Sequence, residues 1–231
     1  MDEQELLRLF VERRSIRKYH NLPVEWEKLG MLLEAARNAP SSGNLQNWKF
    51  VIVRDKEKRE KIAEACLKQY WMLTAPVHIV VYALPELCGR FYGSRGKNLY
   101  SIQNCAAAIE NMLIMAHALG LGTCWVGAFD ENMLIDAVGS KAGAVPQAVI
   151  TIGYADERPP NPGREDFYSM VFLEEYGQRV SDKDIVNKNY GKKLQKSVKE
   201  LATELTDVSE KELNKTKPLL NKLKEKLRKL P

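Results

Sequence analysis

Apolar residues recur along this chain with two spacings, one typical of helices and one typical of buried strands. Helical spacing predicts helices over residues 2–13, 24–38, about 56–68 and 98–119, and a short one near 130–138. Continuous apolar runs predict strands over residues 49–55, 75–84, 122–129 and 146–155. Helices and strands alternate after the first two helices. The pattern therefore favours a layered fold of the α/β or the α+β class and does not by itself choose between them.

The composition changes from about Ser181 on. Residues 183–231 hold 14 Lys and Arg against 7 Asp and Glu, a net charge of +7, whereas residues 1–182 carry a net charge of −2. Leucines at near-helical spacing, with Pro218 at the start of the last run, predict amphipathic helices there. We therefore divide the chain into a folded domain, residues 1–180, and a basic helical C-terminal extension, residues 181–231.

Composition also bears on location and partners. No run approaches the roughly 20 apolar residues of a membrane span, and the chain opens on an amphipathic helix, so we expect a cytoplasmic protein with no membrane partner. The four cysteines lack metal-ligand spacing, so we expect no metal site and four small buried side chains. The basic extension leaves nucleic-acid binding as an alternative. Against it, the lysines alternate with glutamates, and aromatic residues for base stacking are missing after Tyr190.

A basic segment follows the first predicted helix. Arg13, Ser15 and Arg17 alternate, so in an extended chain their side chains project to the same side. Two guanidinium groups flanking a hydroxyl suit a phosphomonoester, because arginine offers paired donors and the hydroxyl a third. The same residues would also suit a solvated helix end, where cations interact favourably with the helix dipole.

Two further segments are rich in polar or turn-forming residues. Residues 40–48 contain serine, asparagine and glutamine. Their side chains can hydrogen-bond a heterocycle that carries both amide donors and carbonyl acceptors, such as the pyrimidine edge of a flavin. A turn with a helix cap would use the same residue types. Residues 85–97 hold three glycines, one proline and three cationic side chains, which predicts a mobile surface segment.

Three stretches together resemble the nitroreductase family of FMN flavoproteins. They are ERRSIRKYHNLPVEWEKLGMLLEAARNAPSSGNLQNWKFVIVRD, AIENMLIMAHALGLGTCWVGAFD and PQAVITIGYADERPPNPGRE, and the resemblance spans roughly residues 8–175. It implies an α+β, three-layer fold with a central, mainly antiparallel sheet flanked by helices. It also implies a homodimer with two FMN sites at the subunit interface. The C-terminal extension lies outside the common core of the family.

The resemblance implies a role for each matching residue. The FMN phosphate would be held by Arg13, Arg14, Ser15 and Arg17, and by Arg164 after the last core strand. The flavin would be approached from the other subunit by Pro40, Ser41, Ser42, Asn44 and Gln46. The backbone of Trp125, Val126 and Gly127 would lie beside the isoalloxazine. Two positions depart from the family pattern: Asn47 replaces the usual proline, and Gln103 replaces an acidic residue of many relatives.

The resemblance further implies transfer of electrons from NAD(P)H through FMN to an acceptor such as a nitroaromatic or a quinone, with ping-pong kinetics. We nominate no catalytic side chain, because the flavin carries the chemistry at N5. The candidates for contacts with the acceptor and the nicotinamide are Arg90, Phe91, Tyr92 and Arg95; an exposed loop without a ligand role is the alternative. Other chemistry on the same fold stays open, namely dehalogenation, dehydrogenation or flavin fragmentation, as does FMN binding without turnover.

Overall fold

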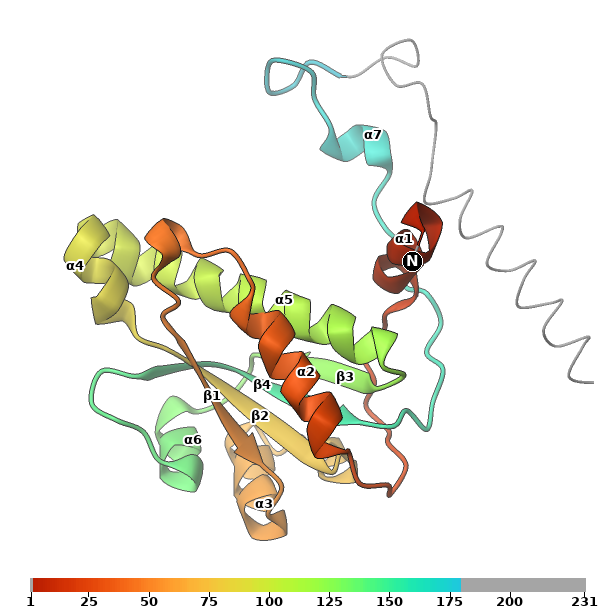
Figure 1. Ribbon diagram of the computed structural model, residues 1–231, viewed down its shortest axis with the longest axis vertical. Coiled ribbons are helices and arrows are strands. Elements are labelled where there is room, and N and C mark those ends of the chain that lie inside the picture. The colour runs from red at the N-terminus through yellow and green to blue at the C-terminus, as the bar shows by residue number, and fades with distance from the viewer. Residues whose placement is uncertain (1, 180–231) are drawn as a thin grey trace, which may run out of the picture. The chain divides into compact units, whose positions relative to one another are not determined.

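The computed structural model describes residues 2–179, which fall into two compact units, 2–162 and 163–179. The first unit contains a four-stranded sheet with the strand order β1-β2-β4-β3 (Figure 1). The strands are β1 (Trp48–Val53), β2 (Val77–Ala83), β3 (Gly122–Val126) and β4 (Val145–Gly153). Every neighbouring pair is antiparallel. The fold is therefore of the α+β class, as the resemblance implied, and the α/β alternative is excluded.

Helices cover both faces of this sheet (Figure 1). The helices of the first unit are α1 (Glu3–Glu12), α2 (Trp26–Arg37), α3 (Lys56–Ala65), α4 (Pro85–Arg95), α5 (Ser101–Ala118) and α6 (Glu131–Val138). Alternate residues of the central strand β2 face opposite layers, because successive strand side chains point to opposite faces. Ile79 and Val81 share a core with side chains of α2 and α5, whereas Val80 and Tyr82 share one with those of α3 and α6. The predicted three-layer arrangement is confirmed.

Strand β2 explains why its sequence is one continuous apolar run. All seven of its residues are buried, since the strand has a neighbour on each edge and helices on each face. In register, Val80 lies opposite Val51 of β1 and Val149 of β4. A strand covered on both faces cannot show the apolar–polar alternation of a half-exposed strand.

The helices begin where the sequence offers caps. Asp2, Asp55 and Asp130 each accept a backbone N–H with their side chains at the start of α1, α3 and α6. Helix α1 also has a capping box, because the Glu5 carboxylate accepts the N–H of Asp2. None of the residues of α1 is buried by the part of the chain that the structure describes.

Residues 85–97 differ from the sequence prediction of a mobile surface segment. Pro85 opens α4, and the chain continues through a short π-helical turn, η3 (Gly96–Tyr100), into α5. Only Gly93 among the three glycines has a left-handed backbone, with φ of 57°. A Cβ on Gly96 would lie 2.4 Å from the carbonyl oxygen of Cys88, so this glycine permits close packing and does not break the helix.

The second unit, residues 163–179, is described by itself. It holds one helical turn, α7 (Phe167–Met170), and an antiparallel bridge between Phe172 and Arg179. The predicted helical extension, residues 181–231, lies outside the described residues. No helix in residues 2–179 combines the length and apolar character needed to cross a membrane.

Candidate flavin site

The basic segment lies beside the edge strand β3. Ser15 forms a parallel bridge with Thr123, and the N–H of Ile16 donates to the Thr123 carbonyl at 2.9 Å. Gly122 makes this approach possible, because a Cβ there would lie 2.9 Å from Cγ1 of Ile16. The segment is extended at this bridge, which is the conformation that the alternation of Arg13, Ser15 and Arg17 requires.

The buried thiol of Cys124 follows Thr123 in β3. Burial raises the pKa of Cys124, while the positive charge of Arg17, a hydrogen bond with Ser15 and the charge of Arg13 oppose that rise. The bridge between Ser15 and Thr123 thus places the basic segment along the first half of β3.

The arginines of this segment differ in their bonding. Nε of Arg13 is buried and has no hydrogen-bond partner among residues 2–179; a carboxylate oxygen of Glu110 lies 4.0 Å away. The guanidinium of Arg14 donates to the carbonyls of Val11 and Arg13 at 2.6 and 2.7 Å, which closes the end of α1. Arg17 lies over the ring of Trp71, 5.9 Å from its centroid. Nε of Arg13 thus has an ion pair with Glu110 but no hydrogen bond within the described residues, whereas part of the donor set of Arg14 holds the helix end.

Two acidic residues after β4 fix the basic segment, and sequence reasoning missed both. The Glu157 carboxylate accepts the N–H groups of Arg17 and Lys18, the latter at 3.1 Å. The Asp156 carboxylate lies 2.8 Å from Nζ of Lys18, and this contact lowers the pKa of Asp156. The available signal was the acidic pair within the third matching stretch, although nothing in its spacing identified residues 17 and 18 as partners.

The polar loop between α2 and β1 is compact and conformationally unusual. It contains a 3-10 turn, η1 (Ser42–Asn44), and both Asn44 and Gln46 have positive φ, at 57° and 35°. Hydrogen bonds within the loop stabilise it. The side-chain amide of Gln46 donates to the Asn44 carbonyl at 2.5 Å, and the backbone N–H of Gln46 donates to Oγ of Ser41 at 3.2 Å. Non-glycine residues in this backbone region are a marker of functional loops. Pro40 precedes the turn and is exposed.

Two buried asparagines lie beneath this loop. Oδ1 of Asn104, in the first turn of α5, accepts the N–H and the hydroxyl of Ser42 at 3.0 and 2.9 Å. Nδ2 of Asn104 donates to Oδ1 of Asn47 at 2.8 Å, and Nδ2 of Asn47 donates to the Ser101 carbonyl at 3.1 Å. Sequence reasoning noted Asn47 only as a departure and did not single out Asn104. The only signal for Asn104 was an amide within an otherwise apolar helix.

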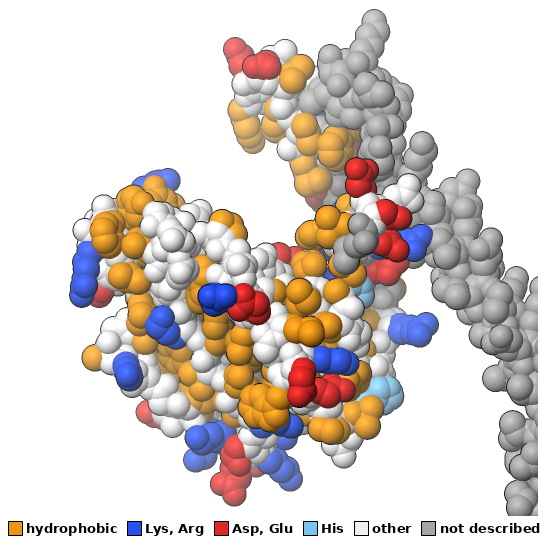
Figure 2. All heavy atoms as spheres, in the orientation of Figure 1, with side chains coloured by type: hydrophobic (Ala, Val, Ile, Leu, Met, Phe, Trp, Pro, Cys, Tyr) orange, Lys and Arg blue, Asp and Glu red, His pale blue; other side chains and the backbone are white. Residues whose placement is uncertain are grey.

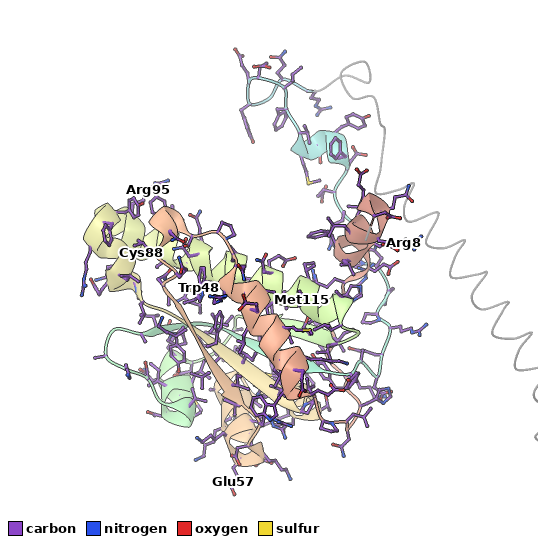
Figure 3. The ribbon with its side chains drawn as sticks, viewed as in Figure 1. Arg8, Trp48, Glu57, Cys88, Arg95 and Met115 are labelled. Carbon is purple, nitrogen blue, oxygen red and sulfur yellow. The ribbon has the colours of Figure 1, made fainter. Side chains whose placement is uncertain are left out.

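Helix α4 meets the polar loop. A Cβ on Gly43 would lie 2.5 Å from the hydroxyl of Tyr92, so the loop and α4 are in close contact. Arg90, Phe91 and Arg95 are exposed, Phe91 to 67%. Figure 3 shows Arg95 at the outer end of α4 and Cys88 on its inner side. The residues predicted to contact an acceptor thus share one end of the unit with the polar loop.

The end of β3 carries the third predicted group. Trp125 is 39% exposed, Val126 is buried, and Gly127 is exposed just after the strand. Four residues of strand separate Thr123 from Gly127, a span of about 13 Å at the usual rise. An elongated ligand bound along β3 could therefore meet the basic segment and the Trp125–Gly127 backbone at once.

Arg164 belongs to the second unit, where its guanidinium donates to the Gly163 carbonyl at 2.8 Å. Because the two units are described separately, its predicted role at the phosphate stays a prediction. The contact of the basic segment with β3, and that of the polar loop with α4, belong to the first unit alone. Figure 2 shows the surface of this unit hollowed above α5, between α4 and α1.

Known proteins resemble this chain along most of the first unit. A protein of Archaeoglobus fulgidus, provisionally named NADH dehydrogenase/NAD(P)H nitroreductase, is 35% identical over 169 residues, which are 71% of this chain and 90% of that protein. An NAD(P)H FMN reductase of Bacillus subtilis is 29% identical over 167 residues, 67% of each chain. The structure of an FMN-dependent nitroreductase from Clostridium difficile superposes with a TM-score of 0.64 at 29% identity, covering 74% of this chain and 99% of that one. The family model Nitroreductase family matches residues 10–71 and 66–154, more than half of the chain. This chain therefore belongs to the nitroreductase family.

Proposed function

We propose that this protein is an NAD(P)H-dependent oxidoreductase that binds FMN and passes electrons to a small acceptor such as a nitroaromatic or a quinone. The observation that carries the proposal is the extended basic segment bridged to β3 at Ser15 and Thr123, with the buried Nε of Arg13 left without a hydrogen-bond partner among residues 2–179. The names of the relatives, among them an FMN reductase and NAD(P)H nitroreductases, support the same activity.

The residues present fit an FMN phosphate. A phosphomonoester dianion needs several donors and positive charge, and the segment offers two guanidinium groups and a hydroxyl. The buried Nε of Arg13 has no hydrogen-bond partner in the described part of the chain. We assign the phosphate to Arg13, Ser15 and Arg17, with Arg14 and Arg164 as further ligands. The Trp125–Gly127 backbone would flank the ring, and Pro40–Gln46 of the second subunit would meet its polar edge.

FMN, when bound, supplies hydride acceptance and donation at N5, so the chain itself needs no acid or base. The role of the protein is to bind, to orient and to exclude water. Arg90, Phe91, Tyr92 and Arg95 on α4 are our candidates for contacts with the acceptor and the nicotinamide. We infer that the two substrates use the same face in turn, which gives ping-pong kinetics.

The proposal includes a homodimer. Leu6 and Phe10 of α1 and Ile102 of α5 are exposed apolar side chains in the described part of the chain. Apolar side chains over α1 and α4 are visible in Figure 2. We propose that a second copy covers this face and brings its polar loop to the flavin. Residues 66, 88, 105 and 124 are free, buried cysteines, which suits the reducing cytoplasm where NAD(P)H is used.

The test compares FMN with riboflavin, which lacks the phosphate. The purified full chain should be yellow, and either NADH or NADPH should bleach the flavin absorbance under anaerobic conditions. Arg13→Gln should weaken FMN binding by about tenfold or more and leave riboflavin binding nearly unchanged, because it removes a charge-assisted hydrogen bond to the phosphate alone. Arg54→Gln makes the same substitution outside the basic segment, at an arginine that lies over the ring of Trp26, and is the matched control.

Three results would contradict the proposal. A colourless protein that ignores added FMN excludes the cofactor. A yellow protein that neither NADH nor NADPH bleaches is an FMN-binding protein and not a reductase. Equal loss of FMN and riboflavin affinity in Arg13→Gln removes the phosphate assignment.

A further inference from the structure

The amide groups of Asn104 and Asn47 are ordered in one direction. The N–H of Ser42, which can only donate, fixes Oδ1 of Asn104 toward the loop at 3.0 Å. The carbonyl of Ser101, which can only accept, fixes Nδ2 of Asn47 toward α5 at 3.1 Å. Between them, the Asn104 amide donates to the Asn47 oxygen at 2.8 Å. Backbone groups at both ends therefore determine both amide orientations. Each side-chain nitrogen and oxygen of the Asn104–Asn47 pair makes a hydrogen bond.

Asparagine is the side chain that position 104 requires. A leucine would leave the Ser42 N–H and the Asn47 oxygen without their partner in a buried place, and an unpaired buried polar group is costly. An aspartate would accept from Ser42 but would turn a second acceptor toward the Asn47 oxygen. Asn47 is equally specific, since the proline usual at its position in the family has no side-chain acceptor for Asn104.

The Asn104–Asn47 pair also reaches α4. Nδ2 of Asn104 lies 3.6 Å from Sγ of Cys88, and the main-chain oxygen of Asn47 accepts the N–H of Leu84 at 2.8 Å. The hydroxyl of Ser101 donates to the Lys97 carbonyl at 2.7 Å. The polar loop, the beginning of α4 and the turn η3 are thus joined through Asn47, Asn104 and Ser101. This is the end of the unit where Tyr92 touches Gly43.

We propose that Asn104 is a positioning residue for the flavin-contacting loop. It holds Ser42 and thereby Ser41–Asn44 in the conformation that meets the polar edge of the flavin, and Asn47 holds Asn104 in turn. Asn104 acts through Ser42 and does not touch the cofactor. The inference rests on the proposed function, because it concerns the loop that we assign to FMN.

The test uses the full chain freed of flavin. Wild type is compared with Asn104→Leu, with Asn104→Asp and with Gln103→Leu, which removes an amide from the exposed neighbouring position. Deuterium uptake of the 41–46 backbone is measured without flavin, and FMN affinity by the quenching of flavin fluorescence. Asn104→Leu should speed exchange at Ser42 and weaken FMN binding by about tenfold or more. The amides of β2 should exchange at the wild-type rate in Asn104→Leu. Gln103→Leu should match wild type in both deuterium uptake and FMN affinity.

Asn104→Asp separates positioning from packing, because it hardly changes the volume. The introduced carboxyl can donate to the Asn47 oxygen only when protonated, and burial raises its pKa. FMN affinity of this variant, taken relative to wild type at the same pH, should therefore improve by about tenfold from about pH 8 to about pH 5. The titratable group that a described contact places beside Asn104 is the thiol of Cys88. Burial raises the pKa of that thiol, against the opposing hydrogen bond from Asn104, so it stays neutral over this range.

Each outcome decides a different question. Wild-type FMN affinity in both Asn104 variants overturns the inference and leaves the proposed function standing. Weaker binding that comes with loss of protection in β2, and without the pH effect in Asn104→Asp, indicates a structural role only and also overturns it. Equally weakened FMN binding in the control variant Gln103→Leu also overturns the inference. A wild-type chain that does not bind FMN overturns the proposed function, and the inference with it.

Discussion

His78 lies in the central strand of the sheet and is fully buried. Its Nε2 is 3.0 Å from the Met72 carbonyl, while Nδ1 has no hydrogen-bond partner among residues 2–179. Burial lowers the pKa of His78 to about 4, and the charge of Arg59 acts in the same direction, against the bond to Met72. His78 is therefore a core histidine of which only one of the two nitrogens is paired within the described residues.

Because of this shift, acid should destabilise the protein at a mildly acidic pH. Between pH 6.5 and about 4 the unfolded chain protonates His78 and the folded chain does not, so the free energy of unfolding falls as the pH drops through this window. The loss is about 3 kcal/mol. Denaturant unfolding of wild type and His78→Gln at several pH values measures it, with His20→Gln as the exposed control. Equal pH slopes in wild type and His78→Gln would exclude the effect.

At the same scale, the sequence identified some site residues and missed others. The alternation of Arg13, Ser15 and Arg17 is visible in the sequence itself and suits a phosphate as well as a solvated helix end. The resemblance to the family was needed to nominate these residues for FMN. Asn104 and Glu157 were missed because their partners, Ser42 and Arg17, are distant in the chain. Only the folded chain brings such pairs together, and a single asparagine or glutamate carries no signal of its partner.

Among the elements, the strands and the long amphipathic helices were predictable. Strands β2 and β3 lie within the predicted runs, and β1 and β4 each begin one residue before theirs. The bounds of α2 and α5 differ from the predicted ones by one to three residues. Such elements are specified by periodic apolar positions. The strand order was not predictable from this pattern, because β2 and β4 pair across most of the domain and apolar spacing does not name partners.

Helix α4 shows why glycine content misleads. The three glycines of residues 85–97 predicted a mobile surface segment. Gly89 and Gly96 instead have helical backbones, and only Gly93 is left-handed. Gly96 is required by the neighbouring carbonyl of Cys88, a contact between helical turns. The sequence shows that a position is glycine, but it does not show whether the fold needs glycine there for a turn or for a close contact.

The two glycines should respond in opposite ways to the same substitution. Gly96→Ala places a Cβ 2.4 Å from the Cys88 oxygen and should lower the free energy of unfolding by about 1–3 kcal/mol. Gly89→Ala meets its nearest atom at 3.6 Å and should raise it by about 0.5–1 kcal/mol, since alanine favours a helix. Thermal and denaturant unfolding measure both changes. Stabilisation by Gly96→Ala would show that the close contact is absent.

On the scale of the whole molecule, the apolar face of α1 needs a surface to pack against. The helix begins with a complete capping box, but none of its side chains is buried by the described chain, and Leu6 and Phe10 are about half exposed. An amphipathic helix draws most of its stability from packing of its apolar face. This is the reason that a second copy of the chain is part of the proposed function.

Substitutions on that face should separate the subunits. Phe10→Lys should convert a dimer to a monomer in sedimentation and weaken FMN binding, because the polar loop of the second copy is lost. Met133→Lys introduces the same charge at an exposed apolar residue of α6, on the other face of the sheet, and should change neither. A Phe10→Lys protein that stays monomeric and binds FMN as tightly as wild type would refute the shared site.

The bridge between Ser15 and Thr123 has a consequence for synthesis on the ribosome. The basic segment emerges early, but its partner strand β3 follows only after β1, β2 and α5 have been translated, and β4 must then pair on its other side. Non-local pairings form late, because loop closure must precede them. On the proposed function, the phosphate site is therefore complete only after β3 has left the exit tunnel, so FMN should bind to a nearly complete domain and not to its first helices.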